Sequence, residues 1–177
     1  MKKVMTILFI RNETNILLGM KKRGFGTGIW NGFGGKVEEK ESILEGAIRE
    51  VREESGLVLD PNDVNKIGTI HFERKSHEVH PYSEVHIYEA RKYSGEIMES
   101  EEMSPKWFKI HRLPEQMWPD AVFWLPYVLR NQTFTAYVLY KNDNFSYLRL
   151  TTDQIWRQPQ KDREVHFESA QCSLAEN

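Results

Sequence analysis

The alternation of apolar and polar residues near the amino terminus predicts the first hairpin of a β-sheet. Residues 4–10 are rich in β-branched and aromatic side chains, and residues 16–20 repeat this pattern after a polar segment that favours a turn. Comparable runs predict further strands at residues 64–72, 83–91, 107–110, 134–140 and 147–150, of which the last two would form a closing hairpin.

The clearest helix of the sequence covers residues 42–55. Ser42 and Glu45 have the spacing of a capping box, and Gly56 is the residue type that ends helices in the left-handed conformation. A second helix is predicted at residues 120–130. Because strands and helices interleave, we expect an α/β fold with helices packed on a mixed sheet. One apolar stripe runs along the first helix and comprises Ile43, Leu44, Ala47, Ile48 and Val51.

Some segments have no regular pattern. Residues 24–28 contain three glycines and mark a flexible loop, and residues 30–36 are aromatic and glycine-rich without a helical or strand periodicity. From about Asp153 the chain becomes polar. We therefore predict one domain over residues 1–152, long enough for its own hydrophobic core, and a polar tail over residues 153–177.

The charges are nearly balanced, with 24 basic and 26 acidic residues and a formal net charge of -2. This balance argues against a nucleic acid polymer as partner, since such binders usually carry a basic surface, but it allows a single nucleotide as ligand. The one cysteine, Cys172, excludes an intrachain disulfide and is compatible with a reducing compartment. No apolar run is long enough to span a bilayer. We expect no membrane partner and a cytoplasmic location, with the mitochondrion and the nucleus as alternatives.

Three glutamates gather on the helix predicted at residues 42–55. Glu50 and Glu54 lie one turn apart beside the apolar stripe, and Glu53 lies on the outer side of the same patch. Crowded carboxylates at the edge of a buried face repel one another, and clustered carboxylate oxygens are what a magnesium ion requires. The alternative is a solvated charged face, in which Arg49 pairs with Glu53 at i, i+4.

The residues before this helix complete a longer pattern. It reads Gly35, five residues, Glu41, seven residues, Arg49-Glu50-Val51, one residue, Glu53-Glu54, one residue, Gly56-Leu57. The pattern resembles the Nudix box at all nine specified positions over 23 residues. The resemblance implies an α/β/α sandwich around a mixed β-sheet. It also implies hydrolysis of a nucleoside diphosphate linked to another moiety, with magnesium or manganese as cofactor.

The resemblance also implies a catalytic and metal-binding set. Its members are Glu50, Glu53, Glu54 and the backbone carbonyl of Gly34 for the metal, Arg49 for orienting the glutamates, and Glu41 for capping or bracing the loop. Such a set suits phosphoryl chemistry, which needs positioning and charge neutralisation more than covalent help. A metal held by glutamates can polarise a diphosphate and lower the pKa of the attacking water.

Further segments resemble the MutT-type branch of this family, whose members remove oxidised purine nucleoside triphosphates. They are residues 19–26, 30–37, 101–103, 107–108 and 117–120, and the similarity extends over roughly residues 4–150. We therefore expect hydrolysis of triphosphates of the 8-oxo-dGTP type to the monophosphate and pyrophosphate, which sanitises the nucleotide pool and prevents DNA damage. The expected partner is a small-molecule nucleotide, and we expect the protein to be a monomer.

The same resemblance implies a substrate-binding set. Asn31 and Asp120 would bond the base edge, and Trp118 would stack on the base, because a purine face stacks well on indole. Lys21 would lie near the phosphates, and Glu102 would add a carboxylate to the metal site. The remaining members are Phe25, Phe72 and Met103 as the lining of the pocket, Thr6 near its floor, and Phe33, Gly35 and Lys36.

Each of these roles has an alternative. Trp118 and the other apolar members are of types that usually belong to a core, and Lys21 could be a surface lysine. Asp120 follows a proline and could cap the second helix. The substrate could be another nucleotide, such as ADP-ribose, a dinucleoside polyphosphate or an RNA cap. A non-catalytic nucleotide-binding module is a further alternative, but it would be expected to lack one of the metal-binding glutamates.

Three positions depart from the MutT-type pattern. Ala121 stands in place of a second aspartate after Trp-Pro, Thr69 in place of a glutamine, and Ser83 in place of a pocket methionine. Two adjacent carboxyls could exchange protons and read both guanine and adenine edges, whereas Asp120 alone could not unless another group replaces its neighbour. The sequence therefore predicts a narrower base range, with 8-oxo-dGTP favoured over 2-hydroxy-dATP.

Overall fold

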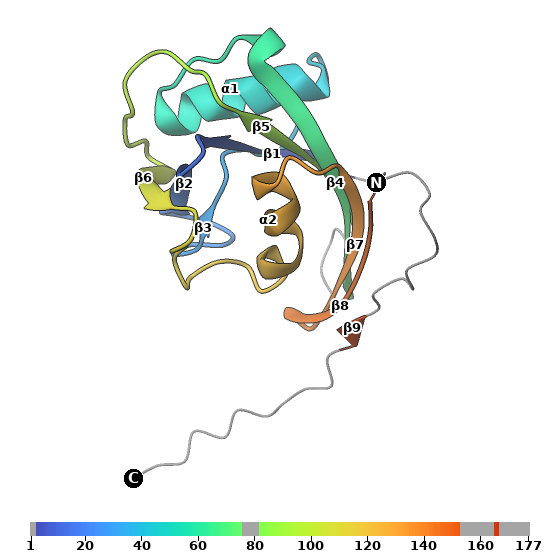
Figure 1. Ribbon diagram of the computed structural model, residues 1–177. Helices are drawn as coiled ribbons and strands as arrows, with labels where there is room; N and C mark the ends of the chain where they lie inside the picture. The colour runs from blue at the N-terminus through green and yellow to red at the C-terminus, as the bar shows by residue number, and fades with distance from the viewer. Residues whose placement is uncertain (1–2, 76–81, 153–164, 167–177) are drawn as a thin grey trace.

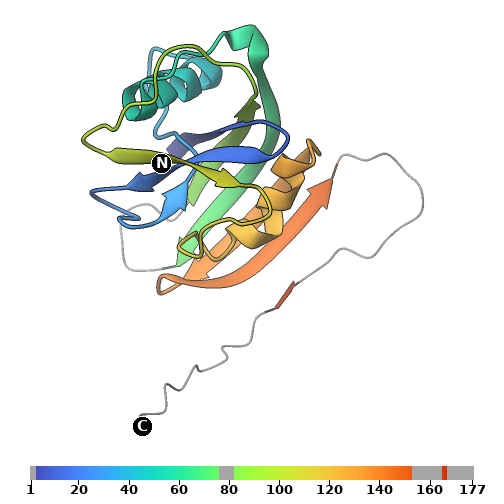
Figure 2. The same ribbon diagram turned by 60° about the vertical axis from the view of Figure 1, so that its left-hand side comes forward.

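The computed structural model describes residues 3–75, 82–152 and 165–166. Within these ranges, two α-helices pack on opposite faces of one β-sheet (Figures 1 and 2). In chain order the elements are β1 (Lys3–Arg11), β2 (Asn15–Lys21), β3 (Trp30–Asn31), α1 (Ile43–Ser55), a short 3-10 helix η1 (Pro61–Asp63), β4 (Val64–Lys75), β5 (Tyr82–Ala90), β6 (Met103–Lys109), α2 (Ala121–Leu129), β7 (Phe134–Lys141), β8 (Asn144–Thr152) and β9 (Val165–His166). No helix of this described part is long and apolar enough to cross a bilayer.

The sheet combines parallel and antiparallel neighbours. Its strand order is β3-β2-β1-β5-β4-β7-β8-β9, and β6 pairs with β2 outside this path. β1 runs parallel to β5 and β4 runs parallel to β7, whereas the other pairs are antiparallel. The expected α/β/α sandwich around a mixed sheet is confirmed, with α1 on one face and α2 on the other (Figure 1).

Each face of the sheet has its own hydrophobic core, because successive side chains of a strand point to opposite faces. Leu8 of β1 packs under α1, where Val51 belongs to the same buried cluster. Phe9 points to the other face and meets Trp124 of α2, with 6.0 Å between the ring centroids. Side chains of β1 therefore contact both helix layers, α1 on one face of the sheet and α2 on the other.

Helix α1 begins and ends as the sequence predicts. The Ser42 hydroxyl accepts a hydrogen bond from the Glu45 backbone at 3.2 Å, and the Glu45 carboxylate accepts one from the Ser42 backbone at 2.7 Å. Gly56 adopts a φ of 76° and donates its backbone N–H to Arg52. The capping box and the left-handed C-terminal glycine are both confirmed, and together they fix which turns of the chain are helical.

The closing hairpin is longer than predicted. β7 and β8 pair up to a two-residue turn, in which Asn142 and Asp143 have φ angles of 48° and 62°. Asparagine and aspartate tolerate this conformation, and such a turn matches the twist of the flanking strands. β8 therefore begins at Asn144, three residues before the start predicted at residue 147.

Other boundaries differ at the edges of the sheet. β6 begins at Met103, before the predicted start at residue 107, and contains Pro105, which an edge strand tolerates. In the glycine-rich segment 30–36, β3 is followed by single bridges from Phe33 and Lys36 to β1. Two residues of the predicted tail form β9 and pair with β8, whereas the other tail residues lie outside the described ranges.

Replacing Ser42 with alanine removes the side-chain acceptor at the first turn of α1. We expect the free energy of unfolding to fall by about 1 kcal/mol, as for other caps of this type. Ser42→Thr keeps a hydroxyl acceptor and should remain close to the parent. Urea unfolding followed by circular dichroism measures both variants. Equal stability of Ser42→Ala and the parent would contradict a stabilising cap.

Candidate active site

Glu54 is the most buried member of the glutamate cluster on α1. Only 4% of the residue is exposed, and its carboxylate accepts a hydrogen bond of 2.9 Å from the Gly34 backbone N–H. The Lys21 ammonium lies 3.6 Å away. Burial raises the pKa of Glu54 to about 7, against the lowering effects of Gly34 and Lys21, and the like charges of Glu50 and Glu102 raise it further. The Gly34 N–H and the Lys21 ammonium therefore offset only part of the cost of burying the ionised Glu54 carboxylate.

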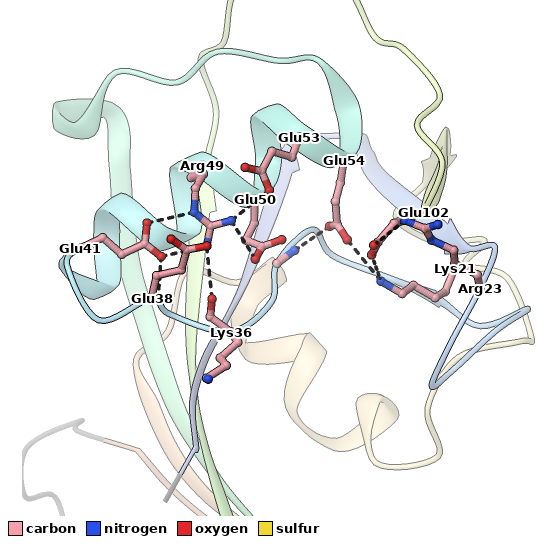
Figure 3. A network of polar contacts seen from close by, with 11 residues as sticks. Lys21, Arg23, Lys36, Glu38, Glu41, Arg49, Glu50, Glu53, Glu54 and Glu102 are labelled. Carbon is pink, nitrogen blue, oxygen red and sulfur yellow. Dashed lines mark hydrogen bonds and ion pairs between the residues drawn. The ribbon is translucent and has the colours of Figure 1, made fainter.

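Arg49 holds the outer part of the cluster together (Figure 3). Its guanidinium donates to both oxygens of Glu41 at 2.8 and 3.0 Å, to Glu50 at 3.1 Å and to Glu53 at 3.0 Å. It also donates to the Lys36 carbonyl at 3.2 Å. The hydrogen bonds from Arg49 lower the pKa of Glu41, whereas burial raises the pKa of Glu50. A planar fork of five donors is suited to this bridging.

A second cation group lies on the other side of Glu54. Lys21 of β2 donates to Glu102 at 2.9 Å, and Arg23 donates to the second oxygen of Glu102 at 3.0 Å (Figure 3). The hydrogen bond from Lys21 is the main cause that lowers the pKa of Glu102. Lys21 therefore stands between Glu54 and Glu102, and it reduces the repulsion between two carboxylates that lie 48 residues apart in the chain.

A cavity of about 960 Å³ opens beside these charges. Polar groups line one part, including Lys21 and Glu102, and aromatic groups line another, including Trp118. Of the residues expected from the sequence, the cavity wall contains Thr6, Lys21, Phe25, Asn31, Gly34, Gly35, Phe72, Glu102, Met103, Trp118 and Asp120. The fold thus collects in one cavity residues from β1, β2, β4, β6 and the segment before α2.

Two expected substrate-binding residues do not line this cavity. Phe33 is fully buried in the core under α1, because its backbone pairs with Leu8 and its side chain points into that layer. Its side chain is therefore part of the core and not of the cavity wall. The side chain of Lys36 is exposed, and its backbone carbonyl accepts from Arg49. Lys36 therefore supports the glutamate cluster through its backbone, which the sequence did not indicate.

The aromatic part of the cavity is closed by a stack of rings. Phe25 is 69% exposed and lies on Trp118 with 5.1 Å between centroids and an interplanar angle of 21°. Gly24 and Gly26 on either side have φ angles of 75° and 82°, which favour glycine. The guanidinium of Arg74 lies over Phe25 at 4.6 Å and over Trp118 at 5.6 Å.

Asp120 lies at the inner end of the cavity and is only 2% exposed. It occupies the position before α2, but its side chain makes no capping hydrogen bond. The carboxylate instead accepts a hydrogen bond of 2.7 Å from the Trp124 indole and another from the Tyr140 hydroxyl. The capping role is therefore excluded. Burial raises the pKa of Asp120, whereas Tyr140 and Trp124 act to lower it.

The structure also reveals cavity residues that the sequence analysis missed. Arg74, Trp124 and Tyr140 lie in the wall, and Ser83 lines it at one of the departing positions. Arg74 and Tyr140 are single residues within strands, so nothing in the local pattern separated them from ordinary sheet positions. Only the pairing of β4 with β7 brings Arg74 beside Tyr140, with 4.5 Å between the guanidinium and the ring.

Comparisons with known proteins identify the family of this chain. The NUDIX domain matches residues 1–128. The chain belongs to the Nudix family. An oxidized purine nucleoside triphosphate hydrolase of Danio rerio is 46% identical over 136 residues, covering 76% of this chain and 85% of that protein. The protein of the same name from Mus musculus is 41% identical over 143 residues, covering 80% and 89%.

A solved Nudix-type structure supports the fold. The MutT protein from Bacillus halodurans superposes with a TM-score of 0.73 at 24% identity, covering 84% of this chain and 97% of that chain. At this level of identity the likeness concerns the sandwich of helices on a mixed sheet.

Nudix hydrolases generally need a divalent metal, and the acidic groups here fit one. Glu50 and Glu54 are desolvated and repel each other, so a cation between them would relieve both effects. Carboxylate oxygens are also the ligands that hard divalent cations prefer. In the structure, Arg49 forms an ion pair with Glu50 and Lys21 forms one with Glu54. Within the described residues, no three acidic, histidine or cysteine side chains are close enough together to hold a metal ion.

Added magnesium chloride should therefore raise the melting temperature of the protein more than sodium chloride does at equal ionic strength. Binding to the folded state stabilises it by about 2.7 kcal/mol when the free cation reaches about a hundred times its dissociation constant. Differential scanning fluorimetry on the metal-free protein measures the shift. The same response to both salts would indicate general screening of charge and would argue against a specific cation site.

Proposed function

We propose that this Nudix protein hydrolyses oxidised purine nucleoside triphosphates to the monophosphate and pyrophosphate, with magnesium as the metal. The observation that carries the proposal is one cavity that joins an aromatic, carboxyl-containing end at Trp118 and Asp120 to a charged end at Lys21 and Glu102. A purine base needs the aromatic end for stacking and hydrogen bonding, and a triphosphate needs the charged end. The names of the relatives at 46% and 41% identity support the same substrate class.

In this proposal the base occupies the inner end of the cavity. The Trp118 indole offers a face for stacking, and Asp120 and Asn31 offer hydrogen-bonding groups for the base edge. Phe25 lies over Trp118 and would have to move aside or stack on the other face of the base. The glycines beside Phe25 give the backbone the freedom for such a change.

The triphosphate then extends toward the glutamates. Lys21 and Arg23 supply positive charge on this side, and the backbone around Gly34 and Gly35 forms the neighbouring wall. Glu50, Glu53 and Glu54 would hold magnesium together with Glu102 and the Gly34 carbonyl. Bound magnesium would neutralise phosphate charge and activate water. Water adds to one phosphorus, the bond between the α- and β-phosphates breaks, and pyrophosphate leaves.

A substrate panel tests this proposal directly. Initial rates are compared for 8-oxo-dGTP, dGTP, ADP-ribose and capped RNA, with and without magnesium, and the products are separated by chromatography. We expect 8-oxo-dGTP to be the best substrate and pyrophosphate to be the second product. Preferential release of AMP from ADP-ribose would instead assign the site to another nucleotide class.

The expected monomeric state and cytoplasmic location remain predictions.

Glu54→Gln keeps the size of the side chain and an acceptor for the Gly34 N–H, but it removes the negative charge. We expect turnover of 8-oxo-dGTP to fall by at least about a hundred-fold, because the lost charge acts mainly in the transition state. Glu39→Gln, an exposed glutamate outside the site, should behave like the parent. The melting temperature of each variant verifies folding. Parent-like turnover of Glu54→Gln would refute its assignment to the metal.

A further inference from the structure

The carboxyl of Asp120 is held by two donors from different elements. Trp124, one turn further along α2, donates its indole N–H to one carboxyl oxygen at 2.7 Å. Tyr140 of β7 donates its hydroxyl to the other oxygen. Asp120, Trp124 and Tyr140 are all buried, and all three line the cavity. Each oxygen of Asp120 therefore already accepts one hydrogen bond, and each keeps a lone pair for a ligand.

The two donors favour the ionised form of this carboxyl. An indole N–H can only donate, and burial raises the pKa of Tyr140, so its hydroxyl keeps its proton. A proton on the Asp120 oxygen that faces Tyr140 would force the hydroxyl to turn and find another acceptor. The titratable and charged groups that face Asp120 from the neighbouring strands are the neutral Tyr140 hydroxyl on β7 and the Arg74 guanidinium on β4. Burial raises the pKa of Asp120, and Tyr140, Trp124 and Arg74 act against this effect by favouring the carboxylate.

The form of the carboxyl decides which base edge it can bind. A carboxylate accepts from two adjacent N–H groups, such as the ring imino and the amino group of a guanine-type edge. An adenine-type edge offers a ring nitrogen that needs a donor, and this edge requires the protonated acid. An ionised Asp120 therefore favours a guanine-type edge over an adenine-type edge.

We propose that Tyr140 is a specificity-determining residue of this cavity, because its hydroxyl keeps Asp120 in the acceptor form that a guanine-type edge requires. The inference rests on the proposed function, since it concerns the base end of the same site. It also accounts for Ala121, where the sequence lacks a second carboxyl. Ala121 is the first residue of α2, is buried in the core and does not line the cavity. In place of an adjacent carboxyl at position 121, the Tyr140 hydroxyl of strand β7 contacts Asp120.

Tyr140→Phe tests this assignment, because it removes the hydroxyl and keeps the ring that packs against Trp118 and Phe145. The substrates are 8-oxo-dGTP and 8-oxo-dATP, which share the oxidised position and differ in the edge. We expect the ratio of their kcat/KM values to fall by about ten-fold, the effect of one hydrogen bond to a charged group. Changes at the phosphate end affect both substrates alike and cancel in this ratio.

Tyr137→Phe is the matched control. Tyr137 lies on the same strand and its hydroxyl also donates to a carboxylate, that of Glu73, but neither residue lines the cavity. The control should keep the parent ratio. A lowered ratio in both variants, or an unchanged ratio in Tyr140→Phe with its melting curve intact, would overturn the inference.

The pH dependence of this kcat/KM ratio gives a second test. It would not change if Tyr140 only stabilised the fold. The ratio should fall as the pH is lowered, because protonated Asp120 donates to an adenine-type edge. In Tyr140→Phe the midpoint of this change should shift upward, since the carboxylate has lost a donor. An unshifted midpoint would contradict the role of Tyr140.

Binding separates this inference from the proposed function. The affinities of 8-oxo-dGMP and 8-oxo-dAMP, followed by tryptophan fluorescence, report on the base edge without turnover. If neither triphosphate is hydrolysed, the proposed function fails, and the ratio of the two affinities still decides the role of Tyr140. A ten-fold loss of preference in Tyr140→Phe supports it, and an unchanged preference refutes it.

Discussion

The close approach of Gly34 to the backbone of β1 is the contact on which the site depends. A Cβ atom at Gly34 would collide with the Thr6 carbonyl, so only glycine allows the segment to lie along the strand. Backbone hydrogen bonds fix it there, from Thr6 to Gly35 at 2.9 Å and from Phe33 to Leu8 at 2.9 Å. The Gly34 N–H then points at Glu54. One steric constraint thus joins the sheet, the cavity wall and the acidic helix.

The same neighbourhood gathers carboxylates whose ionised form is disfavoured by burial. Arg49 bridges Glu41, Glu50 and Glu53, and Lys21 stands between Glu54 and Glu102. Gly35 brings the backbone so close that an added Cβ would lie 2.5 Å from a Glu50 oxygen. Desolvated carboxylates at this density weaken the folded state, and the same property attracts a divalent cation. Stability and function therefore make opposite demands on these glutamates.

The base end of the cavity depends on a different part of the fold. β4 runs parallel to β7, and this pairing places Arg74 and Tyr140 beside each other. Asp120, just before α2, accepts hydrogen bonds from Tyr140 and from Trp124 of α2. The aromatic groups exclude water from Asp120, so each donor that meets its carboxyl has a strong influence on its protonation. The acidic helix α1 and the helix α2 that supports the base end thus lie on opposite faces of the sheet.

Features that depend on neighbours in the chain could be predicted from the amino-acid sequence. The caps of α1 follow from Ser42, Glu45 and Gly56, because capping bonds span only a few residues. The clustering of Glu50 and Glu54 follows from the helical repeat, and the spacing from Gly35 to Leu57 carried the family. The longer strands were found by their apolar runs, whereas the two-residue strands β3 and β9 were not predicted. The turn at residues 142–143 extended the hairpin of β7 and β8 beyond its apolar part.

Contacts between distant segments depend on the strand order and on the packing of the helices. Phe33 and Lys36 share the motif of the site and both bridge to β1, yet Phe33 is buried in the core and the Lys36 side chain is exposed. Asp120 met its partner Tyr140 through the packing of α2 on β7, 20 residues further along the chain. Local patterns record which residues prefer a helix or a strand, but the partner of a buried charge depends on strand order and helix packing, which no short window of sequence contains.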